Sequence, residues 1–314
     1  MTTMTFVFLA AGVLGTWFGA ELLVRGSARI ALALGIRPLV VGLTVVALGT
    51  SSPEAVVSFV AAARDVGGIA VGNVFGSNIA NIGLILGLVA LLHPVRVVWA
   101  EVRFDTAMMV GATLVASAFT WFDVLNPWTG AVMLGLLLAA LVYYIRGGHA
   151  PGGENPLEDD GVAAARPAVV VPVLISVAGL GLLVLGAHLL VGSAKDIALH
   201  FGVPDEIIGA TMVAVGTSLP ELAASIVAIV RGHHDLGIGN IIGSNQMNLL
   251  FVLGGVAMFG DVDVADSVRT SILPITLLFT AVLLPMMATA GKITRIEAGL
   301  LLAGYCAFAA ASYF

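Results

Sequence analysis

The chain has 314 residues, of which 59% are hydrophobic and 10% are charged, and its formal net charge is −6. About a quarter of the residues of a soluble globular domain are charged. This composition therefore excludes a soluble protein and predicts an all-α integral membrane protein, while the negative charge argues against nucleic acid as a partner. The single cysteine, Cys306, excludes an internal disulfide and a cysteine-based metal site.

Ten segments are apolar over roughly the 20 residues that a membrane-spanning helix needs. We expect these helices at residues 5–32, 38–63, 68–92, 105–122, 127–145, 168–199, 205–230, 236–259, 269–290 and 293–313. The N-terminus has no basic region or small-residue cleavage site, so the first segment should remain as a membrane helix. The polar interval 146–167 is expected to link two five-helix units, residues 1–145 and 168–314.

The two units contain copies of one sequence. A shift of 167 residues aligns residues 42–90 with 209–257 without a gap, and 23 of the 49 aligned positions are identical. Loops on one side of the predicted membrane hold ten of the 13 lysines and arginines, which places the linker in the cytoplasm and both termini outside. Because each unit crosses the membrane an odd number of times, we expect two inverted repeats, an arrangement typical of secondary transporters.

The first duplicated motif is GTSSPE at residues 49–54, which recurs as GTSLPE at residues 216–221. Proline cannot donate a hydrogen bond to the fourth preceding carbonyl, so Pro53 should break helix 2, and helix 7 should break likewise. Each glutamate, Glu54 or Glu221, then lies in the first turn of a new half-helix, at the positive end of its dipole. Irregular backbone at membrane depth is tolerated where it is buried in protein or lines a cavity.

The second duplicated motif is GNVFGSNIAN at residues 72–81, repeated as GNIIGSNQMN at residues 239–248. Its glycines suggest a further break in helices 3 and 8, and Ser77, Asn78 and Asn81 would add neutral oxygen ligands. At about 1.5 Å per residue, Thr50 and Ser77 both lie near the middle of the membrane. The inverted copy reaches the same depth from the other side, so four breaks should converge on one point.

That point would hold two carboxylates with hydroxyl, amide and carbonyl oxygens, and the motifs contain no histidine or cysteine. An all-oxygen environment favours hard cations, and calcium takes six to eight such ligands. Two ionised glutamates would neutralise one calcium ion. Without calcium they should bind sodium or take up protons, since two uncompensated charges in a membrane are costly. Competition for the same negative charge is a physical basis for ion exchange.

These motifs resemble those of the cation/calcium exchanger superfamily, most closely its sodium/calcium exchanger branch in the compact prokaryotic form. The resemblance rests on GTSxPE and GxxxGSNxxN, which each occur twice and in register across ten segments. It implies ten helices in two inverted repeats, with calcium on Glu54 and Glu221 and on the carbonyls of Thr50 and Thr217. It places sodium sites on Ala47, Ser51, Ser77, Ala214, Ser218 and Ser244. It places Asn81 and Asn248 as a central pair between the repeats.

The sequence departs from some relatives at Asn248, where potassium-dependent members and some prokaryotic members carry aspartate. Only two motif carboxylates remain, which disfavours potassium co-transport. Proton-coupled relatives usually lack the proline before the glutamate, yet proton coupling stays open as an alternative. We therefore expect a sodium/calcium antiporter that works by alternating access, without enzymatic activity or a cofactor, as a monomer in a prokaryotic cell membrane.

Two other functions use the same residues. A cation channel could employ the glutamates as a selectivity ring, and an intramembrane hydrolase could employ Ser51 or Ser52 as a nucleophile. Midplane breaks in inverted repeats favour an antiporter over a channel, and the motifs offer no base for a nucleophilic serine. Outside the motifs, Glu21 and His188 are expected to be interhelical polar groups, and Ser58 and Ser225 are expected to serve in packing.

Overall fold

The computed structural model describes residues 3–64, 66–147, 169–201, 216–289 and 291–313, and over these ranges the protein is almost entirely helical. The first half contains α1 (Thr3–Leu34), α2 (Pro38–Val41), η1 (Gly42–Val46), α3 (Ala47–Thr50), α4 (Ser52–Ala62), α5 (Gly67–Ile79), η2 (Ala80–Leu86), α6 (Gly87–Leu92), β1 (Val95–Arg96), α7 (Trp99–Trp121) and α8 (Pro127–Gly147). The second half contains α9 (Val170–His200), α11 (Leu219–Val230), α12 (His234–Gln246), η4 (Met247–Val252), α13 (Leu253–Ala257), η5 (Val268–Ile272), α14 (Leu273–Thr289), β2 (Lys292–Ile293) and α15 (Arg295–Tyr313). The prediction of an all-α protein is confirmed.

Several helices, alone or as continuous runs, are long enough to span a membrane. Seven of the described helices are long and apolar enough to cross a membrane, and the bent run from α2 to α4 makes an eighth. The described part of helix 7, α11, has 12 residues, and residues 205–215 of the expected helix lie outside the described ranges. The protein is therefore a multi-pass membrane protein, while the full layout of ten spans stays a prediction.

Helix 2 breaks where the sequence predicts. The helix formed by Pro38–Thr50 ends before Ser51, and Ser52–Ala62 continues at an angle of 48°. Pro53 has no N–H to donate to the Gly49 carbonyl. That carbonyl instead accepts a hydrogen bond of 2.6 Å from the Ser52 hydroxyl. In the second copy, Ser218 has nearly the same backbone conformation as Ser51, directly before α11.

The prediction of breaks in the third and eighth expected helices, residues 68–92 and 236–259, is wrong. The chain stays helical from Gly67 to Leu92 and from His234 to Ala257, and each run changes to π-helical geometry partway. These segments are η2 and η4, which begin close to Asn81 and Asn248. A π-helical turn shifts the hydrogen-bond register without separating the helix into two pieces, and such turns are frequent at functional sites.

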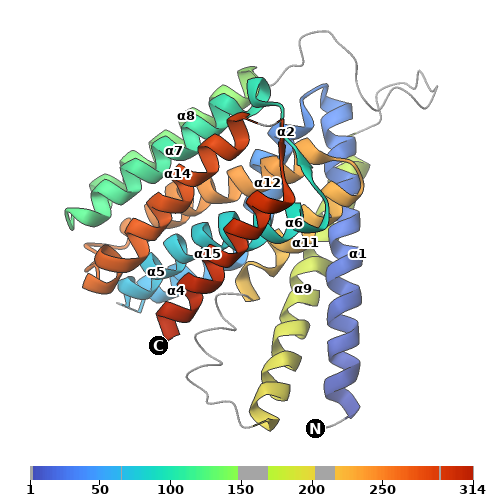
Figure 1. Cartoon of the computed structure of the whole chain (residues 1–314), viewed down its shortest axis with the longest axis horizontal. Helices are drawn as coiled ribbons and strands as arrows, with labels where there is room; N and C mark the ends of the chain where they lie inside the picture. Colours follow the sequence, from blue (N-terminus) through green and yellow to red (C-terminus); the bar gives the residue numbers. More distant parts are fainter. Residues whose placement is uncertain (1–2, 65, 148–168, 202–215, 290, 314) are drawn as a thin grey trace.

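Helix α12 lies at the centre of the molecule. In its membrane span, 94% of the most apolar window is buried, against 33% to 44% for α7, α8 and α9. It packs against α2, η1, α7 and α11, while α7, α8 and α14 lie together on the side away from α1 and α9 (Figure 1). The residues of the second duplicated motif therefore occupy the interior of the protein.

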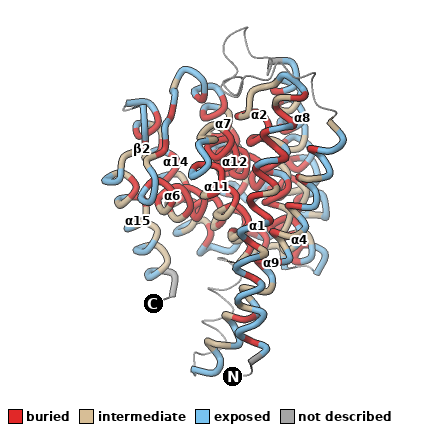
Figure 2. The backbone as a smooth tube through the Cα atoms, turned by 90° about the vertical axis from the view of Figure 1, so that its right-hand side faces the viewer, coloured by how far each residue is buried: buried red, intermediate tan, exposed pale blue. Residues whose placement is uncertain are grey.

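Helices α1 and α9 form a long pair at one edge of the molecule (Figure 1). Small residues allow their backbones to touch: a Cβ atom built on Gly12 would lie 2.6 Å from the Leu190 nitrogen, and one on Gly186 would lie 2.6 Å from the Gly15 carbonyl carbon. The ends of the pair near the N-terminus are largely exposed, whereas the opposite end of α1 is buried against the body (Figure 2).

A short strand pair ties two loops together. Val95 pairs with Ile293 and Arg96 with Lys292 in an antiparallel ladder, and the Val97 amide donates to the Gly291 carbonyl. The pair joins the α6–α7 loop to the α14–α15 loop. The sequence gives no prediction of it, because two-residue strands have no periodicity to recognise.

The close contact between α1 and α9 generates a stability prediction. Gly186→Val would place a branched side chain against the α1 backbone, and overpacking of this kind costs about 1–3 kcal/mol. The matched change Gly192→Val lies on the same helix at a position where a Cβ meets nothing within 4 Å. Thermal unfolding in detergent should show a lower midpoint for Gly186→Val only, and equal midpoints for the two variants would contradict the packing.

Candidate metal centre

The two motif glutamates lie together in the interior. Glu54 and Glu221 are each 1% exposed, and each is in the first turn of its helix, α4 or α11. Ser51 donates a hydrogen bond of 2.9 Å to Glu221, and Ser218 donates one of 3.3 Å to Glu54. Each motif therefore supplies a hydroxyl to the carboxylate of the other motif, and the two breaks meet face to face.

No basic side chain among the described residues forms an ion pair with either glutamate. The ion pairs in the described part of the chain involve Glu21, Asp123 and Asp266 as the acidic partners. One oxygen of each carboxylate, Oε2, is buried without a hydrogen-bond partner. Two uncompensated carboxylates inside a membrane protein are costly, so the arrangement requires a cation or protons.

Further unpartnered oxygens come from the second motif. Asn81 and Asn248 are each 1% exposed and Ser244 is fully buried, and the Asn81 Oδ1, Asn248 Oδ1 and Ser244 Oγ atoms have no hydrogen-bond partner. The elements that carry them pack on the glutamate helices, α4 on η4 and α11 on η2. Buried polar atoms are almost always hydrogen-bonded, so this concentration of free oxygens fits the ligand set of a hard cation.

The other described residues of the predicted site are also buried. Thr50 and Ala47 are inaccessible to solvent, and the Thr50 hydroxyl bonds to Asn240 at 3.1 Å and to the Ala47 carbonyl at 3.4 Å. Ser77 and Thr217 are 5% and 8% exposed. Ala214 lies outside the described residues. Among the residues that the structure describes, no group of three or more histidine, cysteine, aspartate or glutamate side chains could hold a metal, so the candidate centre depends on two carboxylates and neutral oxygens.

Sequence reasoning missed two asparagines that hold the glutamate helices. Asn73 donates to Ser58 at 2.9 Å and to the Glu54 carbonyl at 3.4 Å. Asn240 makes the same contacts in the second copy, to Ser225 at 3.0 Å and to the Glu221 carbonyl at 3.4 Å. The signal that could have revealed them is their exact repetition, together with both serines, at the 167-residue shift.

These contacts also revise the role of Ser58 and Ser225. Both serines are fully buried, as their expected part in packing requires, but each also accepts the amide of an asparagine on the neighbouring helix. Asn240 reaches further than Asn73, since its Oδ1 accepts the Thr50 hydroxyl of the first repeat. One side chain thus connects the break of one motif to the glutamate of the other.

A second set of buried contacts fixes α12 beside the site. Gln246 is 1% exposed, accepts the Tyr144 hydroxyl of α8 at 3.0 Å and donates to the Asp105 carbonyl of α7 at 3.0 Å. The neighbouring Asn245 accepts from Asn81 at 3.5 Å. In the first copy the position that corresponds to Gln246 is occupied by Ile79. The contacts that Gln246 makes to α7 and α8 therefore have no counterpart in the other half.

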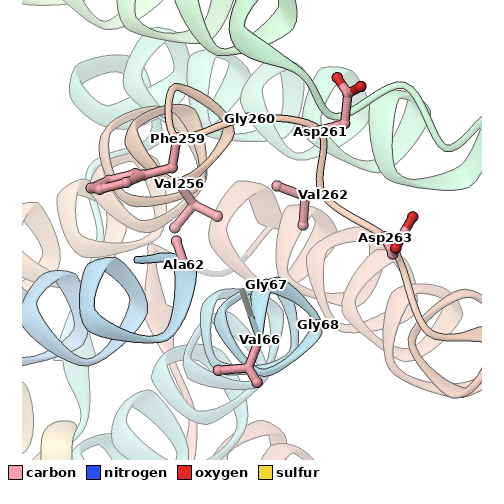
Figure 3. Close-up of a pocket in the computed structure, with 10 residues that line it drawn as sticks. All are labelled: Ala62, Val66, Gly67, Gly68, Val256, Phe259, Gly260, Asp261, Val262 and Asp263. Carbon is pink, nitrogen blue, oxygen red and sulfur yellow. The ribbon is translucent and has the colours of Figure 1, made fainter. Parts of the chain in front are cut away.

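A cavity of about 390 Å³ lies apart from the glutamates. It is bounded by the α4–α5 loop and by the segment that follows α13, with Gly67, Gly68, Phe259, Asp261 and Asp263 among its lining residues (Figure 3). Neither glutamate and no residue of the predicted cation site contributes to it. The interior centre is thus a tight cluster of oxygens and is separate from this surface cavity.

Comparison with known proteins assigns the family. The chain matches the profile of the sodium/calcium exchanger protein family over residues 4–146 and 171–314. It belongs to this family. A protein of Alkalimonas amylolytica that carries the name antiporter CaxA is 40% identical over 93% of this chain and 92% of its own length. The sodium/calcium exchanger MaX1 of Methanosarcina acetivorans is 29% identical over 98% of both chains.

The fold of the exchanger agrees with a solved relative. The crystal structure of the sodium-calcium exchanger NCX_Mj superposes with a TM-score of 0.85 at 31% sequence identity and covers 99% of both chains. The exchanger described here is therefore a cation/calcium antiporter of the same fold, and the family is one of transporters.

The buried carboxylate pair predicts opposite effects of one mutation with and without calcium. Without cations, Glu54→Gln removes one of two like charges and should raise the free energy of unfolding by about 1 kcal/mol or more. With calcium, the variant should lose the stabilisation that a bound ligand gives. Thermal unfolding of Glu54→Gln and Glu221→Gln, with and without calcium, measures the change in stability under each condition. Glu101→Gln, at an exposed side chain, is the control, and calcium stabilisation that survives in both site variants would refute the centre.

The asparagine contacts predict an effect on affinity. Asn240→Ala leaves the Thr50 and Ser225 hydroxyls and the Glu221 carbonyl without their partner, and loss of such an outer contact typically weakens metal binding by about 10- to 100-fold. Calcium titration of the purified protein measures it. Asn126→Ala is the matched control, because the Asn126 side chain caps α8 through the Trp128 and Thr129 amides and bonds to no residue of the predicted site. It should lower stability and leave calcium affinity unchanged, whereas equal affinities for both variants would exclude the positioning role.

Proposed function

We propose that this exchanger moves calcium in one direction against sodium in the other, by alternating access to a single site between two inverted five-helix repeats. The observation that carries the proposal is the pair Glu54 and Glu221, buried without a basic partner and each hydrogen-bonded to the serine of the other motif. The names of the relatives MaX1 and NCX_Mj, both sodium/calcium exchangers, support the choice of ions.

The chemistry of the site supports exchange. Two glutamates balance the charge of one calcium ion, and the surrounding hydroxyl, amide and carbonyl oxygens suit sodium as well. Calcium would bind the two carboxylates and the carbonyls of Thr50 and Thr217. Sodium would occupy positions lined by other residues of the same cluster, namely Ala47, Ser51, Ser77, Ala214, Ser218 and Ser244. Asn81 and Asn248 would lie between the repeats.

Shared ligands make the two ions compete. The carboxylates cannot remain empty and charged in the interior, so the site changes sides with calcium bound or with sodium bound and resists movement when empty. This requirement converts a sodium gradient into calcium movement. If the exchange moves net charge, the membrane potential contributes about 2.3 kcal/mol per 100 mV for each elementary charge.

The proposed placement in the membrane follows the distribution of basic residues. Ten of the 13 lysines and arginines lie in loops on the side of the 146–167 linker, which puts that side in the cytoplasm and both termini outside. We place the protein in the cell membrane of a prokaryote, as a functional monomer surrounded by lipid. Large apolar side chains exposed on α1, α8 and α9 suit contact with lipid chains.

Vesicles that contain the purified exchanger test the coupling ion. With sodium inside and sodium diluted outside, labelled calcium should accumulate, because departing sodium frees the carboxylates. Glu54→Gln and Glu221→Gln should each reduce the initial rate to that of empty vesicles, and Glu101→Gln should retain it.

Two further conditions separate the alternatives. A pH gradient in sodium-free vesicles should drive no calcium uptake, and uptake under that condition would instead establish proton coupling. Calcium entry without any opposing ion gradient would indicate a channel. Sodium-dependent uptake combined with neither of these results supports the proposed antiporter.

A further inference from the structure

A buried carboxylate outside the cation site joins α1 to α11. The side chain of Glu21 is 8% exposed, and Arg231 contacts both of its oxygens, with Nη2 at 3.0 Å from Oε1 and Nε at 3.0 Å from Oε2. Arg25, one turn further along α1, lies 2.6 Å from Oε1. The Nε–Oε2 contact is a hydrogen bond, the Nη2–Oε1 contact is ionic, and the Arg231 side chain is 49% exposed.

This ion pair lies on one side of the proposed membrane. Arg231 directly follows α11, and the half of α1 that carries Glu21 is buried against the body, whereas its N-terminal half is exposed (Figure 2). The buried end of α1 is the end nearer to the start of α9 (Figure 1), and α9 is the first described helix after the predicted cytoplasmic linker. The pair therefore holds α1 against α11 on the linker side.

Arginine is the cation that acts there at neutral pH. His233, two residues after Arg231, is also close enough to feel the charge of Glu21. Burial nevertheless lowers the pKa of His233 below its usual range, so the imidazole is mainly neutral at pH 7. The charge of Glu21 is thus balanced by Arg231 across the interface and by Arg25 within α1.

The other repeat has no equivalent of this pair. The 167-residue shift that superimposes the motifs takes Glu21 to His188, Arg25 to Gly192 and Arg231 to Arg64. His188 and Arg64 are both exposed. His188 and Arg64 therefore replace the acid–base pair of Glu21 and Arg231. A contact between α9 and the end of α4 at these positions cannot be an ion pair.

We infer that Glu21 and Arg231 form a one-sided latch that favours the conformation closed on the linker side. The inference rests on the proposed alternating access between inverted repeats, in which the halves exchange conformations and α9 approaches α4 as α1 now approaches α11. An interaction shifts a conformational equilibrium only when it differs between the two states. The ion pair meets this condition, because the opposite state has only His188 and Arg64 to replace it.

The latch makes the exchanger asymmetric toward its ions. A binding site that is open to one side for only a fraction of the time shows an apparent dissociation constant raised by the inverse of that fraction. Ions on the linker side therefore bind with weaker apparent affinity than ions on the opposite side, although the cation ligands are the same.

Three variants test the latch through the ratio of the apparent KM values for calcium on the two sides. The ratio is measured in vesicles of defined orientation. Glu21→Gln should lower KM on the linker side and raise it on the opposite side, changing the ratio by about fivefold or more. Arg25→Gln removes an ion pair within one helix and should leave the ratio nearly unchanged. His188→Glu supplies an acid opposite Arg64 and should change the ratio in the same direction as Glu21→Gln.

A second measurement needs no transport. Hydrogen exchange should show faster amide exchange in α1 after residue 21 and at the end of α11 in Glu21→Gln, with no such change in Arg25→Gln. Equal changes of KM on both sides in Glu21→Gln, or an unchanged ratio in both Glu21→Gln and His188→Glu, would overturn the latch. Absence of sodium-driven uptake in the unmodified protein would refute the proposed function instead, so the two failures are distinct.

Discussion

Two carboxylates that share a buried, low-dielectric interior without a basic partner are the constraint on which this exchanger depends. Their repulsion and their loss of hydration require a cation or protons. Helix 2 breaks at Ser51, a turn precedes α11, and buried asparagines with unpartnered oxygens lie on elements that pack against the helices of Glu54 and Glu221. Asn73 and Asn240 then hold the glutamate-bearing helices in place, so the carboxylates remain together when no ion is bound.

Duplication accounts for the paired arrangement of the two glutamates, and the two copies differ at positions around them. The serine that satisfies Gly49, Ser52, is replaced by Leu219 in the second copy, and Gln246, which braces α12 against α7 and α8, corresponds to Ile79. Glu21 corresponds to His188. Each change spares the carboxylates and alters how firmly one half is held. The paired glutamates therefore lie between two halves whose supporting side-chain contacts differ.

Much of this could be predicted from the sequence, because the signals are strong ones. Apolar length located the helices, and Pro53 located the break of helix 2, since a missing donor acts locally. The start of α7 at Trp99 rather than residue 105 was missed because Glu101 and Arg103 look like loop residues. The π-helical turns at η2 and η4 replaced the expected breaks because glycine permits distortion without dictating its form. Asn73, Asn240 and the β1–β2 pair depend on tertiary contacts that periodicity does not record. The ion assignments of the individual ligands remain predictions.

The strand pair between Val95–Arg96 and Lys292–Ile293 has a mechanical consequence. It couples the α6–α7 corner to the α14–α15 corner through main-chain bonds, which do not depend on side-chain identity. It thus joins the loops of four helices, α6, α7, α14 and α15, that are far apart in the sequence. In the described chain no strand ladder joins the α1–α9 pair to these helices. The glycine contacts of the pair lie between α1 and α9 themselves, so the two helices form one closely packed unit.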